Sequence, residues 1–325
     1  TFAIGDPVKA DPVSESFWTF DDDGNKMRLR EVKRDAQAIA AGDAELTAKY
    51  TRWMKEDHRF YIRWYDKGIT EANAQTDDDS TVYEVRIIGV NYDSADFNGT
   101  VKNALTFQFV DVLNMNAPDA AKLYRYNDTN VNTGGWFYSE LRRKMQPTNY
   151  HDTDHGDRSL DGAIYAMVPS EVKSCIVGTA KRANQCHVPP NDSFSAIGWM
   201  TDRLFIASYA ELVGSLPEVG VFVGTTSTYL LERPLNGSGN YMSTPYPYYG
   251  QFSLVGNVPS DVLKKGEQRY KLADGTYSQY SYWSQRSAHP STNIFKSTTN
   301  TGEAMNAAYN TASTSARGIV PCFCF

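Results

Sequence analysis

Long apolar runs are missing from this sequence. Its longest strongly apolar stretch is Val219–Val223, far below the roughly 18 residues that a membrane-spanning helix requires. After Thr1 there is no positively charged start followed by an apolar segment, the pattern of a secretory signal. An excess of positive charge is missing too, because 32 Lys and Arg residues face 38 Asp and Glu residues, which gives a formal net charge of −6. The sequence therefore predicts no membrane insertion and no nucleic-acid partner.

Cysteine is also scarce, with four residues in a chain of 325, so we expect no disulfide framework. Cys175 and Cys186 flank an expected loop, and one residue separates Cys322 from Cys324. Alternate residues of a strand point to opposite faces, so Cys322 and Cys324 are not expected to pair with each other. We expect buried free thiols. A single disulfide between Cys175 and Cys186 is the alternative.

Aromatic and small polar side chains are plentiful. Aromatic residues make up 13% of the chain, which contains 21 tyrosines, while charged residues make up 22%. This composition is typical of a turn-rich, β-leaning globular protein. The length of 325 residues corresponds to one large domain or two ordinary ones. We interpret residues 1–75 as an N-terminal arm, helix and strand that pack on a main domain at residues 76–325.

Hydrophobic periodicity predicts the elements of secondary structure. Apolar residues at helical spacing predict a helix over residues 30–57, with Gly42 as a break. Strands are predicted at 59–65, 82–89, 105–113 and 204–208, where apolar residues alternate or run continuously. A further helix is expected from Gly134 and Gly135 to Met145. Residues 318–325 are so apolar that we expect them to form a buried terminal strand.

Motifs for catalysis and metal binding are few. The densest cluster of metal-ligand types is HDTDHGD at residues 151–157, but it lacks the pattern of a calcium loop and its histidines do not share a helix face. No G-x-S-x-G motif and no phosphate-binding glycine pattern occur. We therefore predict a solvated polar loop, no metal and no cofactor. The alternative is an enzyme, either a metal-dependent oxidase or a hydrolase that uses His151 and His155, which metal analysis would detect.

The most informative segment is 278–318. Of its 41 residues, 21 are Ser, Thr, Asn or Tyr, and its only Lys and acidic residues are Lys296 and Glu303. A neutral surface of this kind has the chemistry of an antibody paratope, where tyrosine supplies contact area and small polar groups supply adaptable hydrogen bonds. Disorder and an ordinary polar surface are the alternatives. The residues that we predict to contact a ligand are Tyr280, Tyr282, His289, Thr292, Asn293, Thr299, Asn300, Asn306, Tyr309, Asn310 and Thr311.

The order of several short motifs resembles a known family. The motifs are VRIIGVNYD at 85–93, LTFQFVD at 105–111, NTGGW at 132–136 with Ser139, Leu141 and Arg142, LFIAS at 204–208 with Glu211, Tyr282-Trp283 with Arg286-Ser287, and RGIVPCFCF at 317–325. They are similar to an uncharacterised bacterial and phage domain family related to the C-type lectin and formylglycine-generating-enzyme fold. The motifs also resemble those of the variable proteins of diversity-generating retroelements. The resemblance implies an α+β, C-type lectin-like fold with a small mixed β-sheet, a few flanking helices and long irregular loops that build a ligand surface.

The resemblance also implies a function. Related ligand-binding proteins carry variable C-terminal segments that a reverse transcriptase diversifies at Asn-type codons, and the composition of residues 288–313 is similar to that outcome. We therefore predict a phage receptor-binding protein or bacterial surface adhesin, located on a virion or cell surface, whose partner is a protein or glycan receptor. A structural virion component is the alternative, and a homo-oligomer such as a trimer is compatible with either. We assign Trp136, Trp283, Arg286 and Gly318 to the scaffold, with the Trp283 indole buried and its N–H hydrogen-bonded.

The sequence departs from this family in two respects. The calcium-ligating motifs of sugar-binding C-type lectins, Glu-Pro-Asn or Gln-Pro-Asp together with Trp-Asn-Asp, do not occur. Calcium-dependent sugar binding is therefore not expected. Cys322 and Cys324 lie in the terminal strand motif rather than in a recognisable copper pair, so the oxidase chemistry of the enzymes is not carried over.

Overall fold

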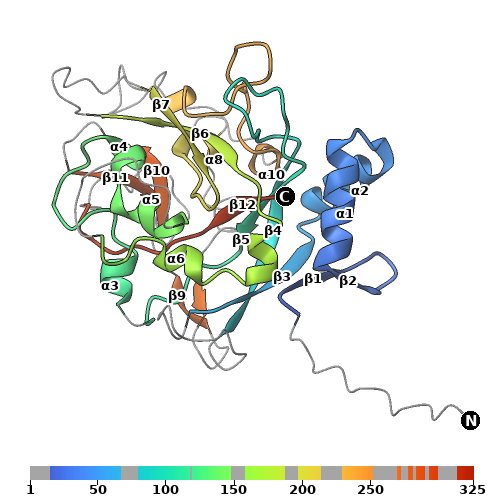
Figure 1. Ribbon diagram of the computed structural model, residues 1–325, viewed down its shortest axis with the longest axis horizontal. Coiled ribbons are helices and arrows are strands. Elements are labelled where there is room, and N and C mark those ends of the chain that lie inside the picture. The colour runs from blue at the N-terminus through green and yellow to red at the C-terminus, as the bar shows by residue number, and fades with distance from the viewer. Residues whose placement is uncertain are drawn as a thin grey trace, which may run out of the picture.

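The protein is an α+β molecule that combines short helices with antiparallel sheets (Figure 1). The computed structural model describes residues 15–66, 80–117, 119–147, 158–186, 197–213, 229–251, 269–271, 277–280, 283–289, 293–298 and 313–325. Within these residues a six-stranded sheet is accompanied by three two-stranded sheets. None of the helices in these ranges combines the length and apolarity that crossing a bilayer demands.

The six-stranded sheet joins the first described strands to the last one. Its order is β12-β5-β4-β3-β1-β2, and every neighbouring pair is antiparallel. The strands are β1 (Phe17–Phe20), β2 (Lys26–Arg28), β3 (Arg59–Trp64), β4 (Thr81–Val90), β5 (Leu105–Phe109) and β12 (Cys322–Cys324). β3 alternates between half-buried and buried residues, as a strand with one face on the core does. The strands predicted at 59–65 and 82–89 are confirmed, whereas the one predicted at 105–113 ends at Phe109.

The terminal strand β12 is buried beside β5, which confirms the expectation for this apolar segment. Phe323 lies opposite Phe107 in the register, and the Phe107 ring centroid is 5.3 Å from that of Phe323, 5.2 Å from that of Phe325 and 5.4 Å from that of Phe17. Each such buried ring contributes about 1.5–3 kcal/mol to stability. One aromatic cluster therefore ties the last strand to the first.

Helices α1 (Leu29–Ala40) and α2 (Ala44–Lys55) pack together at one end of the molecule, beside β1 and β2 (Figure 1). The sequence predicts one helix with a break at Gly42, and the structure has that break. Gly42 has a φ of 96°, a left-handed conformation that glycine adopts at no steric cost. Asp43 then caps α2 by accepting a hydrogen bond from the Leu46 amide at 2.9 Å.

The remaining helices are short. They are α3 (Ala120–Leu123), α4 (Gly135–Tyr138), α5 (Glu140–Met145), α6 (Ala163–Ala166), α7 (Ser170–Lys173), α8 (Tyr209–Leu212) and α10 (Pro247–Gly250). The helix predicted to run from Gly134 to Met145 is thus two helices, because Ser139 is extended and its hydroxyl accepts a hydrogen bond from the Arg142 amide at 3.2 Å. The strand predicted at 204–208 is wrong, since Phe205 forms only an isolated bridge with Cys322.

The three small sheets are hairpin-like pairs. They consist of β6 (Thr179–Asn184) with β7 (Ile197–Asp202), β8 (Arg269–Lys271) with β9 (Tyr277–Tyr280), and β10 (Trp283–Ala288) with β11 (Phe295–Thr298). Gly135, at the start of α4, shows how closely these parts pack. A Cβ at this position would lie 1.9 Å from the backbone oxygen of Asn184 on β6, so only glycine fits there.

Candidate functional site

The candidate site is built on β10 and β11, which we call the C-terminal frame. Trp283 lies opposite Thr298 and Ala288 opposite Phe295, with a shift of register between Ser284 and Ala288. Every residue of both strands is buried. A contact surface in residues 288–313 therefore depends on the residues between and after these strands, while the strands themselves belong to the core.

Most of the predicted contact residues lie outside the described residues, namely Tyr282, Thr292, Thr299, Asn300, Asn306, Tyr309, Asn310 and Thr311. Tyr280 is the last residue of β9. Asn293 is half-buried, and its carbonyl accepts a hydrogen bond from the Ser313 amide at 2.9 Å. His289 is only 6% exposed, and burial together with Lys296 lowers its pKa to about 4, so the ring is neutral. The contact role of these residues stays a prediction, and His289 offers little surface for it.

The residues on either side of 299–312, Thr298 and Ser313, are buried and hydrogen-bonded. Before this segment, the Thr298 hydroxyl accepts a hydrogen bond from the Gln285 side-chain amide at 2.9 Å. After it, the Ser313 carbonyl accepts a hydrogen bond from the Asn127 amide at 3.0 Å, and its hydroxyl donates to the Thr129 carbonyl at 2.9 Å. Thr298 and Ser313 are therefore held in place by described residues.

The Asn132 side chain forms hydrogen bonds with backbone carbonyls next to both β10 and β11. The Asn132 amide nitrogen donates to the carbonyl of His289 at 2.9 Å and to that of Ile294 at 2.7 Å. Asn132 is fully buried, so its two hydrogen bonds exchange little with water. The turn from β10 to β11 is therefore anchored from the loop that precedes α4.

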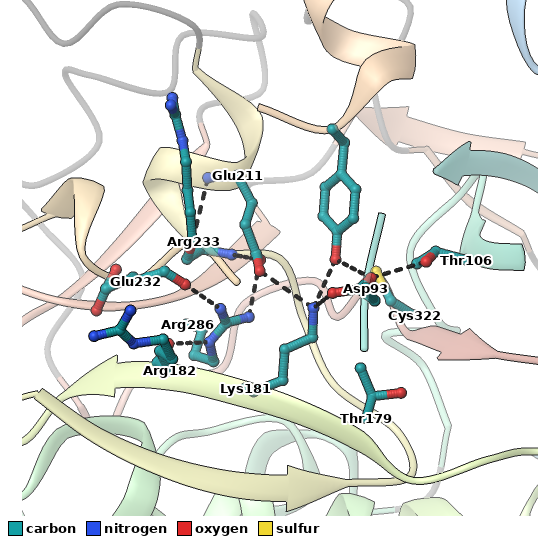
Figure 2. A network of polar contacts seen from close by, with 12 residues as sticks. Asp93, Thr106, Thr179, Lys181, Arg182, Glu211, Glu232, Arg233, Arg286 and Cys322 are labelled. Atoms are coloured by element: carbon teal, nitrogen blue, oxygen red, sulfur yellow. Dashed lines mark hydrogen bonds and ion pairs between the residues drawn. The ribbon is translucent and has the colours of Figure 1, made fainter. Parts of the chain in front are cut away.

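Arg286 holds the C-terminal frame to its neighbours from the centre of β10. Its guanidinium donates to Glu211 Oε2 at 3.0 Å and to the backbone carbonyls of Ile206, Arg182 and Glu232 at 2.7, 3.2 and 3.3 Å (Figure 2). Burial favours the neutral form, but Glu211 outweighs it and raises the pKa of Arg286 above its ordinary value. These four bonds, all to described residues of neighbouring segments, give the scaffold role predicted for Arg286 a physical basis.

Lys181 extends the same network toward the six-stranded sheet. From β6 its ammonium donates to Asp93 Oδ1 at 2.5 Å, to the Tyr246 hydroxyl at 2.7 Å and to Glu211 Oε1 at 3.2 Å (Figure 2). Burial alone would raise the pKa of Glu211, but Arg286 and Lys181 lower it to about 2. Two buried cations therefore balance two buried carboxylates, an arrangement that suits a structural network.

Two further ionisable groups are buried, Glu232 beside Arg286 and Lys296 on β11. Burial raises the pKa of Glu232 to about 7, against the opposing effects of Arg286 and of a hydrogen bond from Ser287. Burial likewise lowers the pKa of Lys296 to about 7, with Glu232 opposing the shift. The Lys296 ammonium lies 4.6 Å from the centroid of the Tyr209 ring, a cation–π contact. With pKa values near 7, both groups change charge near neutral pH, and Lys296 belongs to the C-terminal frame itself.

The other predicted scaffold residues are buried too. The Trp136 indole donates to Asp202 Oδ2 at 2.8 Å, and the Gly318 carbonyl accepts from the Ser284 amide at 2.9 Å. Trp283 is 1% exposed. Its indole nitrogen, however, has no hydrogen-bond partner in the structure, so the prediction of a bonded N–H is wrong.

The structure gives little support to redox or metal chemistry in its described residues. All four cysteines are free and buried, as expected, and burial raises the pKa of Cys324 to about 12 and that of Cys322 well above its ordinary value. Such thiols stay protonated and unreactive. Within the described ranges, no group of three or more His, Cys, Asp or Glu residues could hold a metal ion. His151 and His155 lie outside these ranges.

Sequence reasoning missed most of the buried charge network. It identified Arg286, and it included Asp93 and Glu211 only as parts of motifs. Lys181 carried no signal, because a lysine in a short strand with mixed neighbours is normally solvent-exposed. Its three partners are 30 to 88 residues away along the chain, so no local pattern relates them.

Comparisons of this chain with family models, curated proteins and solved structures found no match. The functional argument therefore depends on composition and on the geometry described above.

Proposed function

We propose that this protein is a ligand-binding protein of a phage or a bacterial surface, and that residues 288–313 form its contact surface for a protein or glycan receptor. A C-type lectin-like fold and diversification of this segment by a retroelement are part of the proposal. Its location would be a virion or a cell surface. A neutral segment rich in Tyr, Asn, Ser and Thr suits adaptable recognition.

One observation carries the proposal. The residues on either side of the segment 299–312, Thr298 and Ser313, are both buried and hydrogen-bonded to described residues. Binding loops usually extend from such rigid scaffolds, since only their own residues then need to vary. Fixed ends also reduce the conformational entropy that a loop loses when it binds.

The buried charge network around Arg286 also supports a contact role for residues 288–313. Arg286 connects β10 to four groups, all of them in the part of the chain that the structure describes. We therefore expect substitutions in the segment 299–312 to leave the network intact. A surface that tolerates substitution above a fixed core is what a diversified binding protein requires.

The test is a binding assay with a matched control. Fluorescently labelled protein is applied to a panel of bacterial cells and to an array of bacterial surface glycans. The variant Asn300→Ala/Asn306→Ala/Tyr309→Ala should lose binding by at least about tenfold, because aromatic and hydrogen-bonding contacts dominate such interfaces. The control variant Asn25→Ala/Asn240→Ala changes exposed asparagines elsewhere and should bind as wild type does. Unchanged binding by the triple variant, or no binding by wild type to any member of the panel and array, would contradict the proposal.

A further inference from the structure

An exposed apolar patch lies away from the C-terminal frame. Of the six large apolar side chains that are exposed in the described residues, four belong to it: Phe97, Val101, Trp199 and Tyr241, which are 40%, 58%, 50% and 37% exposed. We call these four residues the aromatic patch. Exposed apolar residues that gather in this way usually mark an interaction site.

The members of the patch come from three segments that contact each other. The ring centroids of Phe97 and Trp199 are 6.1 Å apart. The loop that carries Phe97 is joined to the loop that carries Tyr241, because the Gly237 amide donates to the Asn98 carbonyl at 3.1 Å. The same loops are joined again where the Lys102 ammonium donates to the Leu235 carbonyl at 3.3 Å. Phe97 and Trp199 are therefore in contact, and Val101 and Tyr241 lie on loops that are hydrogen-bonded to each other.

A cation without an ionic partner borders the patch. Arg182 lies directly opposite Trp199 in the β6–β7 register, and its guanidinium carbon is 5.4 Å from the centroid of the indole ring. Arg182 is half-buried and forms no salt bridge with the residues that the structure describes. Its Nε and Nη1 atoms are buried and have no hydrogen-bond partner, and burial lowers the pKa of Arg182. A carboxylate of a partner at the accessible part of this guanidinium would supply an ionic partner.

The patch also has a carboxylate at its border. Asp96 precedes Phe97 and accepts hydrogen bonds from the Thr100 hydroxyl at 2.6 Å and the Val101 amide at 2.7 Å. These bonds lower the pKa of Asp96, so the carboxylate stays ionised. One surface thus carries apolar rings, an unpaired arginine and an ionised aspartate, which makes it complementary to a copy of itself.

We propose that the aromatic patch is the contact face of a symmetric dimer of this chain. In a two-fold interface the same surface meets itself, so that residue i of one copy meets residue j of the other and the reverse. Trp199 and Phe97 form the apolar centre, and Arg182 of each copy pairs with Asp96 of the other. Tryptophan and arginine are the residues that most often dominate the energy of such interfaces. The proposal does not depend on the ligand-binding function of residues 288–313.

Sedimentation velocity over a series of protein concentrations tests the dimer. Wild type should change from monomer to dimer as its concentration increases, and Trp199→Ala should weaken the dimer by at least about tenfold. Phe20→Ala, which removes an exposed ring from β1, is the matched control and should dimerise as wild type does. Circular dichroism and thermal unfolding check that each variant is folded.

A charge exchange decides whether the partner is a second copy. Arg182→Glu and Asp96→Arg should each prevent dimerisation alone, because every symmetric pair then carries like charges. An equimolar mixture of the two variants should dimerise again, since both Arg182–Asp96 contacts become pairs of opposite charge. Val101→Glu places a charge at the aromatic patch and leaves Arg182 and Asp96 unchanged. It should also prevent dimerisation.

Four outcomes would overturn the proposal. In the first, wild type stays monomeric at all concentrations, whether or not it binds a carboxylated glycan. In the second, wild type forms a dimer or trimer that Trp199→Ala leaves unchanged. In the third and fourth, either charge variant dimerises alone, or the mixture of the two folded charge variants stays monomeric. Should Asp96→Arg fail to fold, the comparison of Trp199→Ala and Val101→Glu with Phe20→Ala still decides the outcome.

Discussion

Replacing Arg286 by methionine tests the buried charge network most severely. The substitution keeps an unbranched side chain but removes a guanidinium that donates to three backbone carbonyls and to Glu211. Glu211 then keeps only Lys181 as a cationic partner, and Glu232 loses the positive charge that opposes the rise of its pKa. Breaking a buried ion pair by removing one partner costs about 3–5 kcal/mol. This is a large share of the 5–15 kcal/mol by which a native domain is typically stable.

The assay is equilibrium unfolding in urea, followed by tryptophan fluorescence and circular dichroism. The midpoint should decrease while the slope m stays constant, because the surface exposed on unfolding is unchanged. The control is Arg52→Met, which removes exposed salt bridges to Asp22 and Glu56 and should cost less than about 1 kcal/mol. A loss below about 1 kcal/mol for Arg286→Met, indistinguishable from the control, would refute the structural role of the network.

Three further predictions concern buried groups. Folding lowers the pKa of Lys296 to about 7, so above pH 7 the unfolded chain binds more protons and the unfolding free energy should rise toward pH 10.5. Lys296→Met should reduce that rise and leave the part due to Lys144, whose pKa burial lowers to about 8, and an identical pH profile in urea titrations would contradict the assignment. Cys322 and Cys324 should resist Ellman's reagent at pH 8 until the protein unfolds; rapid labelling of the native protein would show that they are accessible. Trp136→Phe should cost about 1–3 kcal/mol in urea unfolding because Asp202 loses a buried donor, and a neutral result would contradict this role.

Local patterns in the sequence predict a large part of the fold. The alternation of apolar residues from 82 to 89 predicts β4, and the structure extends it by one residue at each end. The apolar tail predicts β12, because a segment of this kind must be buried. The break at Gly42 is predicted from the residue type alone, and its φ of 96° gives the reason.

Contacts between distant segments account for what the sequence did not predict. Residues 204–208 are as apolar as a strand, yet Phe205 only bridges Cys322, since the edge of β12 that β5 leaves free is shared between Phe205 at Cys322 and Val177 at Cys324. The helix from Gly134 is divided because the Ser139 hydroxyl competes for a backbone amide. The pairing of Lys181 with Asp93 depends on the finished fold and has no local signal.

The central claim is that a fixed frame presents residues 299–312 to a receptor. The most direct test measures stability and binding of a single variant. In this variant the residues of the segment 299–312 are shuffled, so that composition and length are kept and the order is changed. The account predicts that the unfolding free energy stays within about 0.5 kcal/mol of wild type, while binding to the panel of cells and glycans is lost. Retained binding, or a variant that no longer folds, would contradict the claim that a fixed frame presents this segment to a receptor.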